Sequence, residues 1–275
     1  MKNCKFINNT AKGAGGAIRW NGDNGTITDC NFISNTARGD GGAVCWYGIN
    51  GTLFDSNFIS NRFISSSNNG GSAVYWYGTN GSLVGCNFTH NINDKRYGTV
   101  WWSGANGILS DCTFTSNFCG DLASGVYWSG ANGILTSSTF INNTAKYVST
   151  ITISSSSNYK HNLICCTFIN NTSSNSEATV YYSYIIGFMI NCTFANSEWK
   201  KFNLISTDSP LTIDGGRGII NMKVKISNNN PSIHGISIVV LNNETYYYPP
   251  DLNINLIYLQ NHEHETAKDN LQNNQ

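Results

Sequence analysis

The chain of 275 residues carries little charge, because 16 basic residues balance 16 acidic ones and charged residues make up only 12% of the sequence. This neutrality argues against a nucleic-acid partner, since phosphates favour a concentrated basic surface. The sequence also lacks an apolar run near the roughly 20 residues needed to cross a bilayer, so we expect no membrane insertion by this chain.

A repeat of 26 residues organises most of the chain and is clearest from Cys30 to Asp55. Each unit carries a phenylalanine at the same place, and the steps between them are 26, 26, 30, 26, 26, 28 and 26 residues: Phe6, Phe32, Phe58, Phe88, Phe114, Phe140, Phe168 and Phe194. A glycine-rich period of this length is typical of stacked coils. The sequence therefore predicts an all-β parallel β-helix, a solenoid of about 26 residues per coil, over residues 1–197.

Within each predicted coil, alternate positions of one strand are expected to point into the core. Each phenylalanine follows a Cys or Ser column by two residues, so both columns share the inner face, and the residue between them points to solvent. Like side chains of successive coils would stack about 4.8 Å apart. A uniformly apolar column is also expected to face inward: Ile27, Leu53, Leu83, Leu109, Leu135, Leu163 and Met189.

Two corners of each coil are predicted from asparagine. One is a column that tolerates a bent backbone and can form a ladder of amide hydrogen bonds: Asn9, Asn35, Asn61, Asn91, Asn117, Asn143 and Asn171. The opposite corner carries Asn-Gly at 24–25, 50–51, 80–81, 106–107 and 132–133. There we expect the glycine to supply the positive φ.

An aromatic strand follows, with two alternating columns. One column is Trp20, Trp46, Trp76, Trp102, Trp128 and Tyr182, and the other is Arg19, Cys45, Tyr75, Trp101, Tyr127 and Tyr181, continued by Tyr47 and Tyr77. We prefer a buried Trp column, with its exposure as the alternative, and either arrangement leaves a strip of rings on the surface. Flat rings on a rigid surface suit sugar faces or apolar groups of a partner. The candidate ligand-binding residues of this strip are Tyr75, Tyr77, Trp101, Tyr127 and Tyr181.

The later part of the chain departs from the repeat. Residues 147–164 lack both the aromatic strand and the Asn-Gly corner and are expected to form the least regular coil, while extra residues near 65–69 and 147–159 are interpreted as loop insertions. Residues 198–260 are β-rich, and we prefer a small separate β module over degenerate coils that cap the solenoid. Residues 261–275 are predicted to be a disordered tail.

We predict no catalytic residue, no metal site and no cofactor. Asp29, Asp55 and Asp111 occupy equivalent positions, but no basic residue recurs beside them, so we interpret them as solvated corner residues. The sequence His-Glu-His-Glu at 262–265 lacks the spacing of a zinc motif. Six of the nine cysteines lie in the inward column, where buried thiols are preferred over disulfides because parallel side chains seldom reach the disulfide torsion.

The repeat resembles a known family through Asn3-Cys4-Lys5-Phe6-Ile7-Asn8-Asn9-Thr10-Ala11, Gly15-Gly16-Ala17-Ile18 and Cys166-Thr167-Phe168-Ile169-Asn170-Asn171-Thr172. These units are similar to those of the adhesin-like surface proteins of methanogenic archaea and of polymorphic outer-membrane proteins, which form right-handed parallel β-helices. The resemblance covers residues 1–197, with a weaker one at 245–250. It implies an extracellular, non-enzymatic protein of an archaeal cell surface that attaches to glycans or proteins of another cell and is part of a longer surface protein.

Two alternatives to adhesion stay open. Parallel β-helices also form polysaccharide-acting enzymes such as lyases, hydrolases and epimerases, and a solenoid can serve as a purely structural spacer. Because the sequence begins inside a repeat, we also expect a missing N-terminal region that carries a cap and an export signal.

Overall fold

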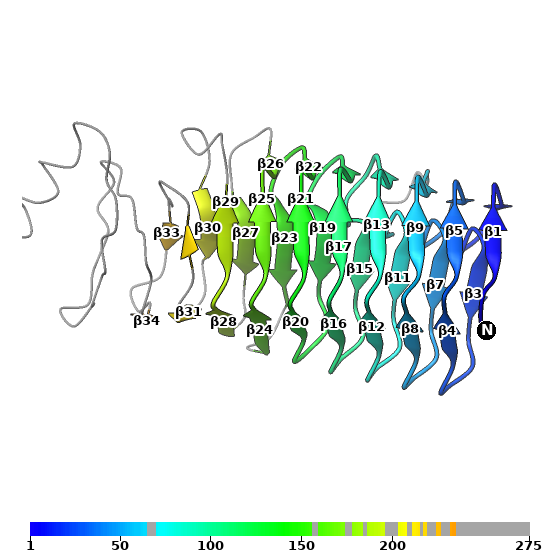
Figure 1. Cartoon of the computed structure of the whole chain (residues 1–275), viewed down its shortest axis with the longest axis horizontal. Coiled ribbons are helices and arrows are strands. Elements are labelled where there is room, and N and C mark those ends of the chain that lie inside the picture. Colours follow the sequence, from blue (N-terminus) through cyan, green and yellow to red (C-terminus); the bar gives the residue numbers. More distant parts are fainter. Residues whose placement is uncertain are drawn as a thin grey trace, which may run out of the picture.

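Successive coils of the chain stack along one axis in the computed structural model (Figure 1). The structure describes residues 1–64, 70–155, 159–173, 178–183 and 186–195, and five later strands between residues 203 and 234. Across these residues it is all-β, and none of them forms a helix that could cross a membrane. Four parallel sheets run along the axis, with coil partners 26 residues apart in most coils, which confirms the predicted parallel β-helix.

Each regular coil contributes one strand to each of four sheets. The phenylalanine sheet contains β1 (Lys5–Ile7), β5 (Asn31–Ile33), β9 (Asn57–Ile59), β13 (Asn87–Thr89), β17 (Thr113–Thr115), β21 (Thr139–Ile141), β25 (Thr167–Ile169), β29 (Thr193–Ala195) and β32 (Arg217–Gly218). The short sheet contains β2 (Thr10–Ala11), β6 (Thr36–Ala37), β10 (Arg62–Phe63), β14 (Ile92–Asn93), β18 (Phe118–Cys119), β22 (Thr144–Ala145) and β26 (Thr172–Ser173).

The other two sheets complete the coil. The tryptophan sheet contains β3 (Ile18–Trp20), β7 (Val44–Trp46), β11 (Val74–Trp76), β15 (Val100–Trp102), β19 (Ala123–Trp128), β23 (Ser149–Ser154), β27 (Ala178–Ser183), β30 (Asn203–Thr207) and β33 (Val224–Ile226). The leucine sheet contains β4 (Thr26–Thr28), β8 (Thr52–Phe54), β12 (Ser82–Val84), β16 (Ile108–Ser110), β20 (Ile134–Thr136), β24 (Lys160–Ile164), β28 (Ile186–Ile190), β31 (Leu211–Asp214) and β34 (Ser232–His234).

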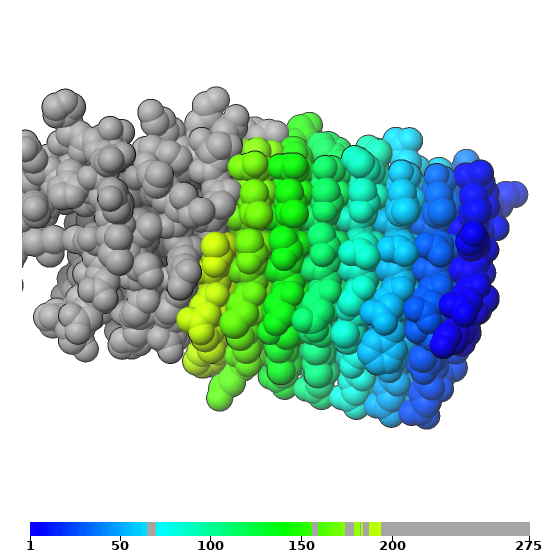
Figure 2. All heavy atoms as spheres, in the orientation of Figure 1, coloured from blue at the N-terminus to red at the C-terminus, as the bar shows by residue number. Residues whose placement is uncertain are grey.

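The register of the sheets follows the predicted columns even where the chain carries extra residues. Phe58 pairs with Phe88 and Phe140 pairs with Phe168, so the longer steps do not displace the strands. The insertion predicted near 65–69 lies outside the described residues, as do residues 156–158 of the second insertion. In the space-filling view the coils form parallel bands across the visible face (Figure 2).

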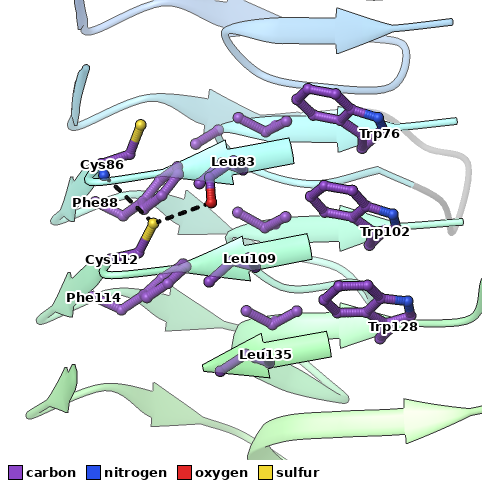
Figure 3. Close-up of a cluster of buried hydrophobic side chains, with 14 of the residues drawn as sticks. Trp76, Leu83, Cys86, Phe88, Trp102, Leu109, Cys112, Phe114, Trp128 and Leu135 are labelled. Carbon is purple, nitrogen blue, oxygen red and sulfur yellow. Dashed lines mark hydrogen bonds between the residues drawn. The ribbon is translucent and has the colours of Figure 1, made fainter. Parts of the chain in front are cut away.

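The core consists of stacked columns of like side chains (Figure 3). Neighbouring Phe rings have centroids 4.6–5.1 Å apart and lie within 11° of parallel. Neighbouring Trp rings are 4.7–5.0 Å apart, and from Trp46 to Trp128 they are buried. The Trp column therefore faces the core, as preferred. Each ring removed from water contributes roughly 1.5–3 kcal/mol.

The cysteines of the inward column pack as buried thiols, and all nine cysteines of the chain are free. Cys112 is representative: its Sγ accepts a hydrogen bond from the backbone N–H of Cys86 at 3.4 Å and approaches the carbonyl oxygen of Leu83 at 3.7 Å (Figure 3). The serines of the same column take this role at Ser56 and Ser138. The column therefore supplies weak hydrogen bonds between coils as well as apolar packing.

The predicted asparagine ladder is present and buried. Asn91 accepts hydrogen bonds from the backbone N–H and the side-chain amide of Asn61 at 2.9 and 3.0 Å. Its own amide donates to the carbonyl oxygen of Phe58 and to the Oδ1 of Asn117. Each ladder amide thus binds the coil on either side, and buried backbone groups at the corner are satisfied.

Each corner contains a residue with positive φ, and at the Asn-Gly corner it is not the expected glycine. At the ladder corner the left-handed residue precedes the ladder asparagine, as at Ser34 with φ 54°. At the Asn-Gly corner the asparagine itself is left-handed, as at Asn24 with φ 55°, and Gly25 is not. The expectation of a positive φ at the glycine was therefore wrong by one residue, because spacing alone does not show where the chain turns.

Glycine at the Asn-Gly corner is required by packing. A Cβ at Gly25 would lie 2.3 Å from the Nε1 of Trp20 in the same coil, and Gly51, Gly81 and Gly107 make equivalent close approaches to their tryptophans. The tryptophan therefore excludes any side chain from this corner.

The irregular coil breaks this rule at both positions. Ile153 takes the place of tryptophan, paired with Trp128. His161 takes the place of the corner glycine, and its Nδ1 accepts a hydrogen bond from the N–H of Gly133 at 3.3 Å. The imidazole is 1% exposed, with its centroid 6.0 Å from the Trp128 ring. The smaller isoleucine leaves room for the histidine, and the pairing of β19 with β23 also shifts register, so the coil is irregular as predicted.

Acid is expected to destabilise the protein through His161. Burial lowers the pKa of this imidazole from 6.5 to about 4. As pH falls through that interval the unfolded chain binds a proton that the folded protein does not, so stability is full above about pH 6.5 and declines toward about pH 4, by up to about 1.4 kcal/mol per pH unit. Urea unfolding across this range measures the loss. The double variant Ile153→Trp/His161→Gly restores the regular pair and should lose less stability over this pH range than the wild type does. Equal losses in the two proteins would contradict the assignment of the effect to His161.

The strands beyond residue 197 extend the same sheets. β30 pairs with β27, β31 with β28 and β32 with β29, and β33 and β34 add one strand more to two of the sheets. These strands pair as the strands of further coils do. Their pairing does not support the preferred prediction of a separate β module. Most of residues 198–260 and the predicted tail at 261–275 lie outside the described residues, as does the segment 245–250.

Candidate binding surface on the tryptophan sheet

The outer face of the tryptophan sheet carries a row of side chains that alternate with the buried columns. Because Val44 and Trp46 point inward, Cys45 between them points outward. The register then places the row in one line along the axis: Arg19, Cys45, Tyr75, Trp101, Tyr127, Thr152 and Tyr181. Tyr47 and Tyr77 follow two residues after their Cys45 and Tyr75 neighbours on the same face.

Six rings on this face form one continuous cluster, which we call the aromatic surface: Tyr47, Tyr75, Tyr77, Tyr97, Trp101 and Tyr127. Trp101 lies at its centre, with ring centroids 4.4 Å from Tyr75 and 4.7 Å from Tyr97. Tyr97 in turn lies 4.4 Å from Tyr127. Tyr47 and Tyr77 extend the cluster at 5.6 Å from one another.

The rings of the aromatic surface differ in what they expose. Tyr77 is 56% exposed, whereas Tyr75 is only 6% exposed and supports its neighbours from below. Trp101 and Tyr127 are half-buried. Hydrogen bonds hold two of the rings in place, since Ser103 Oγ donates to the Tyr75 hydroxyl at 3.1 Å and Trp101 Nε1 donates to Ser129 Oγ at 3.2 Å. The surface is therefore a rigid arrangement of ring faces with hydroxyl groups beside them.

The candidate residue Tyr181 lies apart from the others in register. Thr152, which is buried, stands between Tyr127 and Tyr181 in the row. At the opposite end Cys45 is fully buried, and burial raises the pKa of its thiol to about 12. Because the thiolate is the nucleophilic form, Cys45 is a packing residue with no activated thiol.

One carboxyl group lies beside the first rings. Asp40 is half-buried, and desolvation raises its pKa above the ordinary value. Its charge also acts on the neighbouring groups of Cys45, Tyr47 and Tyr75. No hydrogen bond or ion pair of the Asp40 side chain is found within the described ranges.

The backbone conformation explains why aspartate occurs at the three equivalent positions of the sequence analysis. Asp29, Asp55 and Asp111 have φ angles of 54°, 44° and 55°, a left-handed conformation that aspartate adopts more readily than most residues. Lys2 lies 3.8 Å from Asp29. No group of three or more His, Cys, Asp or Glu side chains that could hold a metal occurs in the described part of the chain, and residues 262–265 fall outside it.

Sequence reasoning missed Tyr97 because this residue belongs to no column. It lies in the connection between β14 and β15, and a bridge to Ala123 places it over the next coil. Asp40 was missed for the same reason. Residues that reach the surface from connections of variable sequence leave no periodic pattern.

The fold and this face define a parallel β-solenoid repeat protein with an ordered aromatic surface on one sheet. No protein-family model, no curated protein and no solved structure matches the chain.

Proposed function

We propose that the protein is a non-enzymatic, adhesin-like protein of a cell surface, which attaches to glycans of another cell through the aromatic surface. The observation that carries this proposal is the continuity of six rings across four neighbouring coils. The resemblance of its repeats to adhesin-like proteins of methanogenic archaea favours an extracellular location and membership of a longer surface protein.

The geometry suits sugar binding for two physical reasons. An exposed ring face such as that of Tyr77 offers a large contact area to the C–H groups of a sugar, and a ring already packed against its neighbours loses little conformational entropy on binding. The hydroxyl groups of Ser103 and Ser129 lie beside Tyr75 and Trp101, where they can bind sugar hydroxyls. The solenoid core keeps these groups in fixed positions.

Alanine at Tyr77 or at Trp101 is expected to weaken glycan binding at least about tenfold, which corresponds to about 1.4 kcal/mol. Glycan-array screening followed by titration of the bound glycan measures the change. Tyr159→Ala is the matched control, because Tyr159 is an exposed ring outside the aromatic surface, and should bind as the wild type does. Tyr75 is unsuitable for this test because it is buried and its loss would disturb packing.

Three outcomes separate the alternatives. Loss of binding in Tyr77→Ala and Trp101→Ala with an unchanged unfolding transition supports attachment through the aromatic surface. The absence of any glycan signal for the wild type would favour a structural spacer. Shortening of a glycan during incubation with the wild type would favour a polysaccharide-acting enzyme.

A further inference from the structure

We infer that the glycan recognised by the aromatic surface is an anionic polysaccharide, one that carries carboxylate or sulfate groups, lying along the solenoid axis. This inference rests on the proposed function and specifies its ligand. It follows from how the coils distribute charge, which the neutral total of the chain conceals.

Between residues 10 and 154, every lysine and arginine lies on one edge of the solenoid, which we call the loop edge. It consists of the described stretches that run from each short-sheet strand to the end of the next tryptophan-sheet strand: 10–20, 36–46, 62–64 with 70–76, 92–102, 118–128 and 144–154. Its basic residues are Lys12, Arg19, Arg38, Arg62, Lys95, Arg96 and Lys146, and its acidic residues are Asp40, Asp94 and Asp121. The stretches between them, from residue 21 to 143, contain Asp23, Asp29, Asp55 and Asp111 and no basic residue.

Ion pairing within the loop edge leaves a surplus of free cations. Arg62 pairs with Asp94, and Arg96 Nε donates to Asp121 at 3.1 Å. The remaining cations are exposed and form no ion pair within the described residues: Lys12, Arg19, Arg38, Lys95 and Lys146. Only Asp40 is left to oppose them. The edge that borders the aromatic surface is therefore positive.

The cations lie against rings of the same edge. Arg19 is 5.1 Å from the centroid of Tyr47, and Arg96 is 5.7 Å from that of Tyr97. Lys146 is 5.2 Å from that of Tyr147, which is 42% exposed. A sugar that stacks on one of these rings brings its carboxylate or sulfate close to a fixed cation, and such charge-assisted hydrogen bonds are the strong ones.

The arrangement fits an extended chain better than a single sugar. Arg19 belongs to the first coil and Lys146 to the coil of Thr152, five steps further along the row. At about 4.8 Å per step the cations span roughly 24 Å. Repeated acidic groups along a polymer can meet them in succession.

Asp40 makes one end of the loop edge less favourable for an anionic ligand than the other. Its carboxyl lies near Tyr47 and Tyr75, at the Arg19 end, where its charge opposes an anionic ligand. Lys95 and Lys146 have no unpaired acidic neighbour on the loop edge. Acidic groups are therefore expected to bind most tightly at the Lys95 to Lys146 end, and Asp40→Asn is expected to raise affinity for anionic glycans alone.

Binding of polygalacturonate and of neutral galactan to the full chain tests the inference, with salt varied in each titration. We expect polygalacturonate to bind at least about tenfold more tightly than galactan and to weaken as salt rises. Lys95→Gln and Lys146→Gln should each reduce that affinity several-fold without affecting galactan, and Asp40→Asn should increase it. Lys160→Gln, a change of an exposed lysine on the leucine sheet, is the matched control and should have no effect.

The outcomes distinguish this inference from the proposed function. Equal affinity for galactan and polygalacturonate would overturn the anionic preference and leave glycan attachment intact, whereas no binding to any glycan would overturn both. A single-stranded oligonucleotide that binds more tightly than polygalacturonate would also overturn the inference, because a nucleic acid would then be the better match for rings beside cations.

Discussion

Alanine at Asn91 is expected to lower the free energy of unfolding by about 4 kcal/mol or more, from the loss of one side chain that makes four hydrogen bonds. The substitution removes one partner each from the backbone N–H and the amide of Asn61, the carbonyl oxygen of Phe58 and the Oδ1 of Asn117 in a buried corner. The Asn61 amide keeps its bond to the carbonyl oxygen of Phe32, and the Asn117 Oδ1 keeps its bond from the backbone N–H of residue 91. Each unsatisfied buried group costs about 1–3 kcal/mol. Urea unfolding followed by circular dichroism measures the change.

A matched control lies four residues earlier in the same coil. Asn87 is exposed, and its amide makes a single hydrogen bond to Asn57 Oδ1 at 3.1 Å, so Asn87→Ala should change stability by less than about 0.5 kcal/mol. Asn91→Asp keeps the shape of the side chain but removes its donors and should also destabilise strongly. Similar stability of Asn91→Ala and Asn87→Ala would show that the ladder is not a principal source of cohesion between coils.

Alanine at Gly107 is expected to destabilise the protein by about 3 kcal/mol or more through overpacking. Its Cβ would lie 2.2–2.5 Å from atoms of the Trp102 indole. That ring cannot withdraw, because Trp76 and Trp128 stack on its two faces with centroids 4.8 Å away. Thermal and urea unfolding should both show the loss.

The first control for Gly107 is Gly22→Ala, because the nearest atom to a Cβ there is the Nε1 of Trp20 at 3.8 Å, an ordinary contact. The second control is a double variant in which a smaller side chain at residue 102 makes room for the new Cβ. In a Trp102→Ile background, adding Gly107→Ala should cost less than about 1 kcal/mol, since the native coil with Ile153 accommodates His161. An additive double variant would argue against steric exclusion by tryptophan.

The periodic parts of the fold could be predicted because stacking of the coils places residues of the same type at equivalent positions of successive coils. The columns through Phe58 and Phe88 kept their register across a longer connection, and the ladder through Asn61 and Asn91 formed at the predicted corner. Period-two alternation was enough to choose the inward columns. A parallel sheet offers few other ways to bury them.

The details of the corners could not be predicted from spacing. The left-handed residue at the ladder corner is Ser34 and not Asn35, and Gly25 is required by the indole of Trp20 and not by its own φ. Both facts depend on where the backbone turns in space. The exchange of Trp and Gly for Ile153 and His161 is a three-dimensional compensation between positions eight residues apart.

The candidate surface was predicted only in part. Alternation identified Trp101 and Tyr127 as outward-facing, but Tyr75 is nearly covered, and Tyr97 enters the cluster from a connection. Binding at these residues stays a prediction until it is measured.

The sequence by itself determined the parallel β-helix, its period, its inward columns and its asparagine ladder, because these follow from repetition along one axis. Only the tertiary structure decided which rings touch, which are exposed and which edge is positive. Contacts between coils depend on side chains about 26 residues apart whose connections vary, and a total charge of zero says nothing about which face carries each sign.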